Sequence, residues 1–467
     1  MCRKFKMGNI KGYCQAIIQI IITNSVSIIL GTLTVFSAIL SILSIALVNE
    51  CKDNQELIIT ILPAVVTFCF TLLGFIFNIV RNCIEQKKII FHKNSSTKIK
   101  KYLRDLLENE SKYKIIDEGK SVLLYSAEEN TFVKAKLGFL LFSEKRSNYS
   151  IPYDISKNSL GILNYFLNNE DGKKVFNSKK IRLNVGMEKI IESYNKIKDP
   201  DSNLKEDNKY KTVQLSKTNY FNSLCTNEII DLEIRSATDT SYCFNGYSLI
   251  IADEKKFNRE HIYTLAESHC SNHIGISTLV KTKDNYLIIS KQNKRSLINS
   301  DLYSVTSSGS ADYKDIRGCK YFSDILIKAM ERELWEECNF TEINKYINDE
   351  EFKKIKESLG NKRKIEKKDL IAETKIIGYG RLLDRGGKPE FFGITKINLT
   401  AKEFELFAST LIEKSKSDKT DYPSIFTAIP VSDSNRIKAV IDEKLNNGKG
   451  NTKITIQLKY YRDVLLN

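Results

Sequence analysis

Two long apolar stretches open this chain, and shorter alternating patterns follow them. The residues from Ile17 to Val48 are almost wholly apolar and uncharged, and the residues from Leu57 to Val80 include no charged side chain. A transmembrane helix needs about 20 apolar residues. We therefore predict a two-helix transmembrane hairpin in residues 1–80, with spans at about 25–48 and 57–80.

The charges that flank these stretches predict an orientation. Four basic residues and no acidic residue precede the first stretch, the connecting segment "NECKDNQE" is mainly acidic, and a basic segment begins at Arg81. Basic flanks stay on the cytoplasmic side of a membrane. The pattern predicts a multi-pass protein of the inner membrane with both termini in the cytoplasm.

The rest of the chain has the pattern of a mixed α+β protein. Residues 81–209 are predicted to form a basic stalk and a mixed α/β connecting segment. This segment ends in the linker-like sequence "KIKDPDSNLKEDNKYK". Residues 210–467 alternate strand and helix signals. The predicted elements are a hairpin of "GISTLV" and "NYLIIS", a helix at 323–338, and a hairpin of "KIIGYGRLL" and "PEFFGITKINL" around the turn "DRGGKP".

The amino-acid composition limits the kinds of partner that the protein is expected to bind. The chain has 72 Lys and Arg against 57 Asp and Glu, a formal charge of +15, but the lysines are spread along the sequence. We therefore expect no nucleic acid polymer as a partner, and an anionic small ligand or lipid stays open. The ten cysteines form no C-x-x-C pair, and the only loose cluster of zinc-type ligands is His269, Cys270 and His273. This usage is typical of a reducing cytoplasm and does not predict a zinc site.

The segment "RELWEECNF", residues 332–340, is the strongest candidate for chemistry. In a helix capped by Ser323, the spacing of Glu333, Glu336 and Glu337 places three carboxylates on one face. Such a set suits magnesium-assisted phosphoryl chemistry, and Arg332 is placed to brace one of the acids. An ordinary solvated acidic helix face is the alternative.

The same segment resembles the R-E-U-x-E-E-x-G-U core of the Nudix box. Gly318 and Asp324 stand at the spacings of the upstream glycine and glutamate, while Asn339 replaces the late glycine. The glycine-rich turn is alternatively "TSSGSAD" at 306–312, which includes Gly309, with "YKDIRGCKYF" as an insertion. The resemblance implies an α/β/α sandwich over residues 210–467. It also implies that the three glutamates bind a metal and that Arg332 orients them.

A Nudix-like domain that follows two membrane spans is similar to the transmembrane-Nudix effectors of CBASS, a bacterial antiphage system. The sequences "YKTVQLSKTNYFNSL" and "RGGKPEFFG" also resemble that subgroup. The resemblance implies that the domain senses a cyclic dinucleotide or trinucleotide made on infection, without a required cofactor. It further implies that the protein then forms a homo-oligomer and disrupts the lipid bilayer, which kills the infected cell.

Two other functions stay open at the level of the sequence. One is a membrane-anchored Nudix hydrolase that cleaves a nucleoside diphosphate derivative with Mg²⁺, and the other is a protein-binding scaffold. For the sensor, the candidate ligand-binding residues are Gly309, Gly318, Lys291, Arg295, Arg385 and Lys388. Catalytic activity is not assured by the motif, and Arg332, Glu333, Glu336 and Glu337 are its candidate residues.

Overall fold

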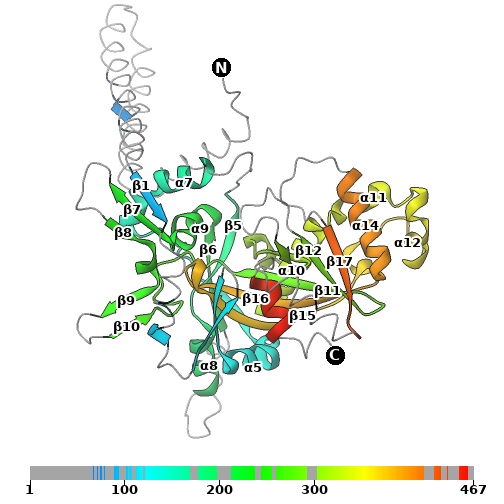
Figure 1. The fold of residues 1–467 in the computed structure, drawn as a ribbon, viewed down its shortest axis with the longest axis horizontal. Helices are drawn as coiled ribbons and strands as arrows, with labels where there is room; N and C mark the ends of the chain where they lie inside the picture. Colours follow the sequence, from blue (N-terminus) through cyan, green and yellow to red (C-terminus); the bar gives the residue numbers. More distant parts are fainter. Residues whose placement is uncertain are drawn as a thin grey trace, which may run out of the picture.

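The structure is a computed structural model, shown in Figure 1. It describes residues 89–93, 112–118, 121–168, 177–196, 212–236, 243–254, 259–291, 302–414, 425–432 and 452–460, together with single positions between 67 and 107 and at 439. Within these ranges the chain forms both sheets and helices, and the predicted α+β composition is confirmed.

A mixed nine-stranded sheet is the centre of the fold. Its strands are β2 (Lys114–Glu118), β3 (Ser121–Tyr125), β11 (Gly275–Lys281), β12 (Tyr286–Lys291), β13 (Tyr303–Ser304), β14 (Ser307–Ser310), β15 (Ile371–Leu382), β16 (Lys388–Ile397) and β17 (Ile425–Pro430). The main order is β13-β12-β11-β16-β15-β3-β2, with β14 beside β11 and β17 beside β12. The β11–β16 pair is parallel, whereas β11–β12 and β15–β16 are the two antiparallel hairpins that the sequence predicts.

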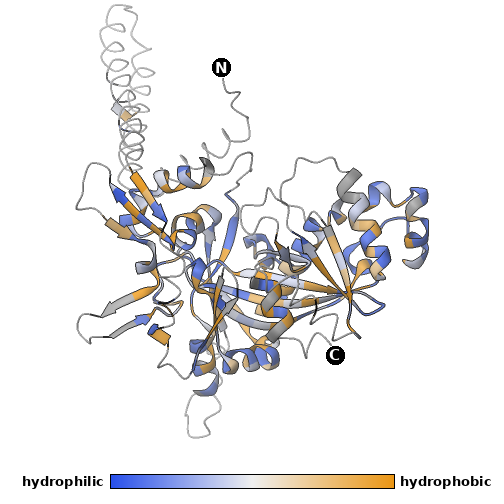
Figure 2. Ribbon diagram, viewed as in Figure 1, coloured by the Kyte–Doolittle hydropathy of each residue, from blue (hydrophilic) through white to orange (hydrophobic). Residues whose placement is uncertain are grey.

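Helices cover both faces of this sheet because apolar residues alternate along its strands. On β11, Ile276 belongs to a core with helix α10 (Phe322–Glu337), and Val280 packs in a core with α14 (Ala401–Lys414). The intervening Leu279 packs with residues of α16 (Thr452–Tyr460) on the opposite face. Figure 2 shows apolar positions concentrated along the strands of this sheet. Three short helices, α11 (Ile343–Tyr346), α12 (Lys353–Ser358) and α13 (Lys367–Leu370), connect α10 to β15.

Three smaller sheets lie beside the large one in Figure 1. Their strand orders are β4-β6-β5, β1-β7-β8 and β10-β9. These strands are β1 (Ile89–Lys93), β4 (Leu141–Glu144), β5 (Lys179–Leu183), β6 (Thr212–Asn219), β7 (Leu232–Ser236), β8 (Cys243–Asn245), β9 (Ile251–Glu254) and β10 (Arg259–Ile262). The accompanying helices are α5 (Ala127–Lys136), α6 (Tyr153–Ser156), α7 (Ser159–Asn168), α8 (Met187–Lys196) and α9 (Tyr220–Thr226).

Strand pairing crosses the boundary that the sequence analysis draws between residues 209 and 210. Strand β6 pairs with β4 and β5, β7 pairs with β1, and β3 joins the large sheet beside β15. Strand β5 also lies between two parts of the second segment. The amide of Ile181 donates to the carbonyl of Ala311 at 3.1 Å, and its carbonyl accepts from the amide of Ile274 at 2.9 Å. The two segments are therefore built together, and the predicted linker at 197–211 lies outside the described residues.

The predicted transmembrane hairpin is wrong: among the described residues, no helix is both long enough and apolar enough to cross a membrane. The multi-pass inner-membrane localisation is wrong on the same finding. The predicted spans at 25–48 and 57–80 lie outside the described residues, apart from single positions.

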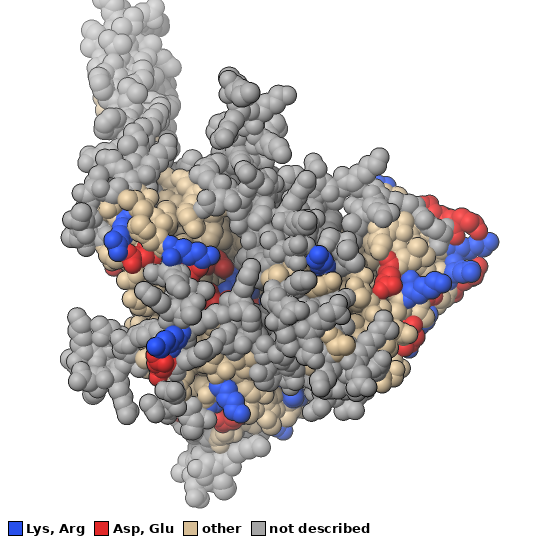
Figure 3. All heavy atoms as spheres, in the orientation of Figure 1, with Lys and Arg blue, Asp and Glu red and all other residues tan. Residues whose placement is uncertain are grey.

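The net positive charge is not concentrated on the face drawn in Figure 3. Among the described side chains visible there, basic and acidic residues are interspersed. Several exposed lysines also have an acidic partner nearby, such as Lys375 with Glu373 at 3.0 Å and Lys189 with Glu192 at 3.2 Å.

Candidate functional site

Helix α10 carries the Nudix-like segment and begins slightly earlier than the sequence predicts. Its N-cap is Tyr321, not Ser323, which lies buried inside the first turn. Asp324 turns back to accept hydrogen bonds from the amides of Tyr321 at 2.9 Å and Lys320 at 3.2 Å. The aspartate at the position of the upstream Nudix glutamate therefore caps its own helix. The helix ends before Asn339, whose φ of 56° is left-handed, as the replacement of glycine by asparagine allows.

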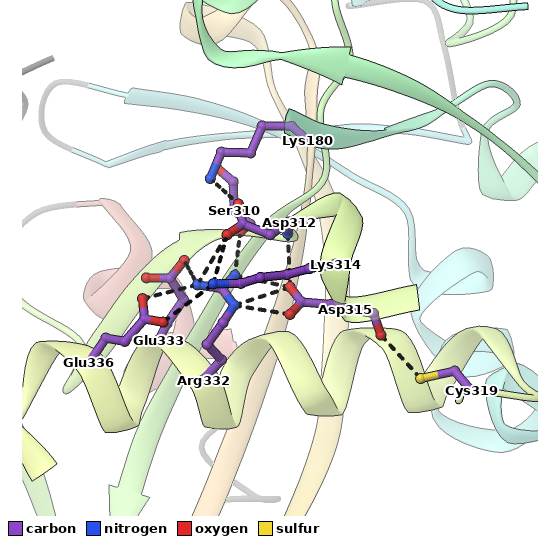
Figure 4. Close-up of polar contacts among 9 residues, drawn as sticks. All are labelled: Lys180, Ser310, Asp312, Lys314, Asp315, Cys319, Arg332, Glu333 and Glu336. Carbon is purple, nitrogen blue, oxygen red and sulfur yellow. Dashed lines mark hydrogen bonds and ion pairs between the residues drawn. The ribbon is translucent and has the colours of Figure 1, made fainter. Parts of the chain in front are cut away.

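Arg332 is the centre of the acidic cluster (Figure 4). It is 8% exposed, and its Nε and Nη2 atoms donate to the carboxylate of Asp315 at 3.0–3.2 Å. Nη1 donates to Glu333 at 2.8 Å and to Glu336 at 3.3 Å, and Nη2 also donates to the carbonyl of Ser310 at 3.0 Å. The acidic neighbours hold the pKa of Arg332 above its ordinary value, although burial opposes its charge.

Further charged side chains surround Arg332 and its acidic partners, and one of them belongs to strand β5 in the first half of the chain. Lys180 of β5 donates to Asp312 at 2.6 Å, and Lys314 lies 3.5 Å from Asp312 and 3.7 Å from Glu336. Burial by itself raises the pKa of Asp312, but Lys180 and Arg332 outweigh it and leave that pKa below its ordinary value. Asp312 and Lys314 thus extend the ion-pair network that Arg332 forms with Asp315, Glu333 and Glu336.

The third motif glutamate faces strand β14 instead of Arg332. The carboxylate of Glu337 accepts a hydrogen bond from the amide of Ser308 at 2.9 Å. Burial, followed by repulsion from Glu333, raises the pKa of Glu337 well above its ordinary value. The three glutamates therefore do not act as the one set that the sequence predicts. Glu333 and Glu336 contact Arg332, whereas Glu337 contacts β14.

Gly309 brings β14 and α10 together. A Cβ atom at this position would collide with the carboxylate of Glu333. We expect Gly309→Ala to push the Glu333 carboxylate away from Arg332 and to lower the free energy of unfolding by about 1 kcal/mol, because the atoms that must move are the end of a flexible side chain. Urea unfolding of the variant checks this value. Gly138→Ala is the matched control, because a Cβ at Gly138 meets no atom within 4 Å. Equal stability of the two variants would contradict this close packing.

The other predicted ligand-binding residues are spread over the structure. Gly318 has φ 75° in the turn before α10, where a Cβ would meet nothing within 4 Å. Lys291 ends β12 and lies 5.9 Å from the ring centroid of Tyr303. Arg385, in the turn between β15 and β16, forms an ion pair with Glu228. Arg295 lies outside the described residues.

Lys388 belongs to a buried ionic centre that sequence reasoning missed. It is 1% exposed and lies 3.3 Å from Glu390 on the same strand, while Lys453 of α16 reaches the other oxygen of Glu390 at 2.6 Å. His273 precedes β11 and is fully buried, and neither ring nitrogen has a hydrogen-bond partner among the described residues. The Lys-Pro-Glu sequence that begins β16 was the available signal, and it does not reveal burial.

The three motif glutamates do not converge as a magnesium site would require. Arg332 lies between Glu333 and Glu336, and Glu337 is turned to β14. In the described part of the chain, no group of three or more His, Cys, Asp or Glu side chains is placed to hold a metal ion. The acids do not fit magnesium in this arrangement, and we derive no metal-dependent step from them.

Comparison with known proteins leaves the family open. No protein-family model matches the chain, and no curated protein matches it. The interpretation of the site therefore depends on the residues described above.

Proposed function

We propose that this protein is a nucleotide sensor that binds a cyclic dinucleotide or trinucleotide without turnover. The observation that carries the proposal is the closed ion-pair network around Arg332, in which Asp315, Glu333 and Glu336 already have a cationic partner. Acids held in this way stabilise the fold, whereas hydrolysis by a Nudix box needs carboxylates that share a metal ion. The resemblance to CBASS effectors supplies the ligand class and a role in antiphage defence.

Basic groups beside the network support an anionic ligand. Lys388 and Lys453 both lie against one carboxylate, that of Glu390, and Lys180 links the Arg332 network to β5. Cations at partly desolvated positions attract phosphate more strongly than surface lysines do. In this proposal, binding of the ligand promotes a homo-oligomer, because a ligand that prefers the associated state shifts the population toward it.

Hydrolysis of a nucleoside diphosphate derivative is the second candidate. It is favoured by Glu336, whose side chain is 46% exposed at the rim of the network and can exchange its partner. If the carboxylates rearrange on binding, Glu333, Glu336 and Glu337 are the residues that would hold magnesium.

Titration calorimetry of the full chain against cyclic dinucleotides, cyclic trinucleotides and nucleoside diphosphate derivatives separates these functions. We expect saturable binding of at least one cyclic nucleotide and no product in the presence of Mg²⁺. Sedimentation velocity with the same ligand should then report a larger species. Magnesium-dependent turnover that disappears in Glu336→Gln/Glu337→Gln would establish the hydrolase instead. Failure of every cyclic nucleotide to bind would overturn the sensor.

A further inference from the structure

Buried His273 lies within electrostatic reach of four cationic side chains. Lys388, Arg385, Lys180 and Lys453 all lower the pKa of His273, after the larger effect of its burial, to well below the ordinary value. These cations come from β16, the turn before it, β5 and α16, so this arrangement is a property of the tertiary fold. A neutral imidazole is left with two ring nitrogens that have no hydrogen-bond partner among the described residues.

Two of these cations share one carboxylate. Arg385 is paired with Glu228 and Lys180 with Asp312, but Lys388 and Lys453 share the single carboxylate of Glu390. Glu337 also lies within electrostatic reach of Lys453. A buried unpaired charge costs several kcal/mol unless an anion joins it.

The side chains around Glu390 are closely packed, and Lys453 is the most exposed of them. Glu390 is fully buried, and a Cβ atom at Gly275 would collide with Glu390 and come within 2.6 Å of Lys388 Nζ. The Lys453 side chain is 10% exposed and belongs to the first turn of the nine-residue helix α16, shown in red in Figure 1. The amide groups at a helix N-terminus favour an anion, and here a lysine lies in the same turn. Further along α16, Gln457 is also fully buried, and its side-chain oxygen has no hydrogen-bond partner in the described residues.

We propose that this cluster, made of His273, Lys388, Glu390 and Lys453, is a binding site for one phosphate group of the ligand. The phosphate approaches at the first turn of α16, takes Lys453 as its main partner in place of Glu390, and accepts a hydrogen bond from His273. It supplies a second negative charge beside the two lysines that share Glu390. The assignment of that phosphate to a nucleotide depends on the proposed function, whereas the site itself does not.

The site should bind anions more tightly at lower pH. Burial lowers the pKa of Lys388 to about 7. The charged groups that act on Lys388 are Glu390, Arg385, Lys453 and Glu228. A protonated Lys388 attracts an anion and a neutral one does not, so affinity should fall as pH rises from 6 to 8.5. Sulfate is the suitable probe because its own charge is constant in this range, and thermal stabilisation by sulfate measures the binding.

The test compares Lys453→Met, Lys453→Arg and a control, Lys375→Met, in the full chain. Lys375 is an exposed lysine on the same sheet with its own partner, Glu373. Calorimetry with pyrophosphate should show affinity at least about tenfold weaker for Lys453→Met, and nearly unchanged for Lys453→Arg and the control. The thermal transition of each variant confirms that it is folded.

Each outcome separates this site from the proposed function. If pyrophosphate binding depends on Lys453 but no cyclic nucleotide binds, the phosphate site stands and the sensor function fails. If a cyclic nucleotide binds wild type and Lys453→Met equally, the sensor stands and the assignment of this site to a phosphate of that nucleotide is excluded. If neither pyrophosphate nor sulfate binds wild type, the site is excluded as well.

Discussion

Replacement of Arg332 by methionine is expected to lower the free energy of unfolding by about 3–5 kcal/mol, because it leaves buried acids without their cation. Asp315 is 2% exposed and receives hydrogen bonds from two nitrogens of Arg332, so its charge would have no comparable partner. Glu333 would lose its 2.8 Å ion pair in the same variant. Urea unfolding followed by circular dichroism measures the change.

Two further variants make this prediction specific. Arg332→Lys keeps the charge but not the bidentate geometry, and it should recover only part of the stability. Arg235→Met removes an exposed arginine that is paired with Glu233, and it should change little. If Arg332→Met lowers the free energy of unfolding no more than Arg235→Met does, the ion-pair network does not stabilise the fold.

The stability of the wild-type protein should rise with pH between 7 and 10 relative to Lys388→Met. The pKa of Lys388 is about 7 in the folded protein, against 10.5 as its ordinary value, and desolvation by burial is the main cause. Between these values the unfolded chain holds a proton that the folded chain has released, so stability increases with pH. At 1.36 kcal/mol per pKa unit, the difference should reach about 3–5 kcal/mol.

Subtraction of the variant isolates Lys388 from the tyrosines and cysteines that titrate in the same range. Chemical unfolding of both proteins at intervals from pH 6.5 to 10 provides the two curves. Parallel curves would mean that Lys388 keeps its proton in the folded state. The buried charge of Lys388 would then be a permanent cost to the fold.

Local patterns predicted the local structure well. The hairpins β11–β12 and β15–β16 and helix α10 were found from alternation, turn composition and apolar spacing. The sequence also placed Arg332 beside Glu333 and Glu336, because neighbours on one helix are fixed by its geometry. The helix cap was misassigned to Ser323, since Asp324 offers a competing cap one residue later.

What the sequence could not predict depends on contacts between distant residues. Lys180 meets Asp312 from a strand 132 positions earlier, and Lys453 reaches Glu390 from a helix near the end of the chain. Nothing in "KKIRL" distinguishes Lys180 from any other surface lysine. The transmembrane prediction is wrong on the finding that no helix among the described residues is long and apolar enough to cross a membrane.

The pairing of β3 with β15 has a consequence for any attempt to divide the chain. A fragment that begins near residue 210 would lack β2 and β3, so the end of β15 at Arg381 and Leu382 would lose its neighbouring strand. An exposed edge strand is a template for pairing between molecules. Such a fragment should therefore associate non-specifically, and self-association seen with it would say nothing about ligand-driven assembly of the whole protein.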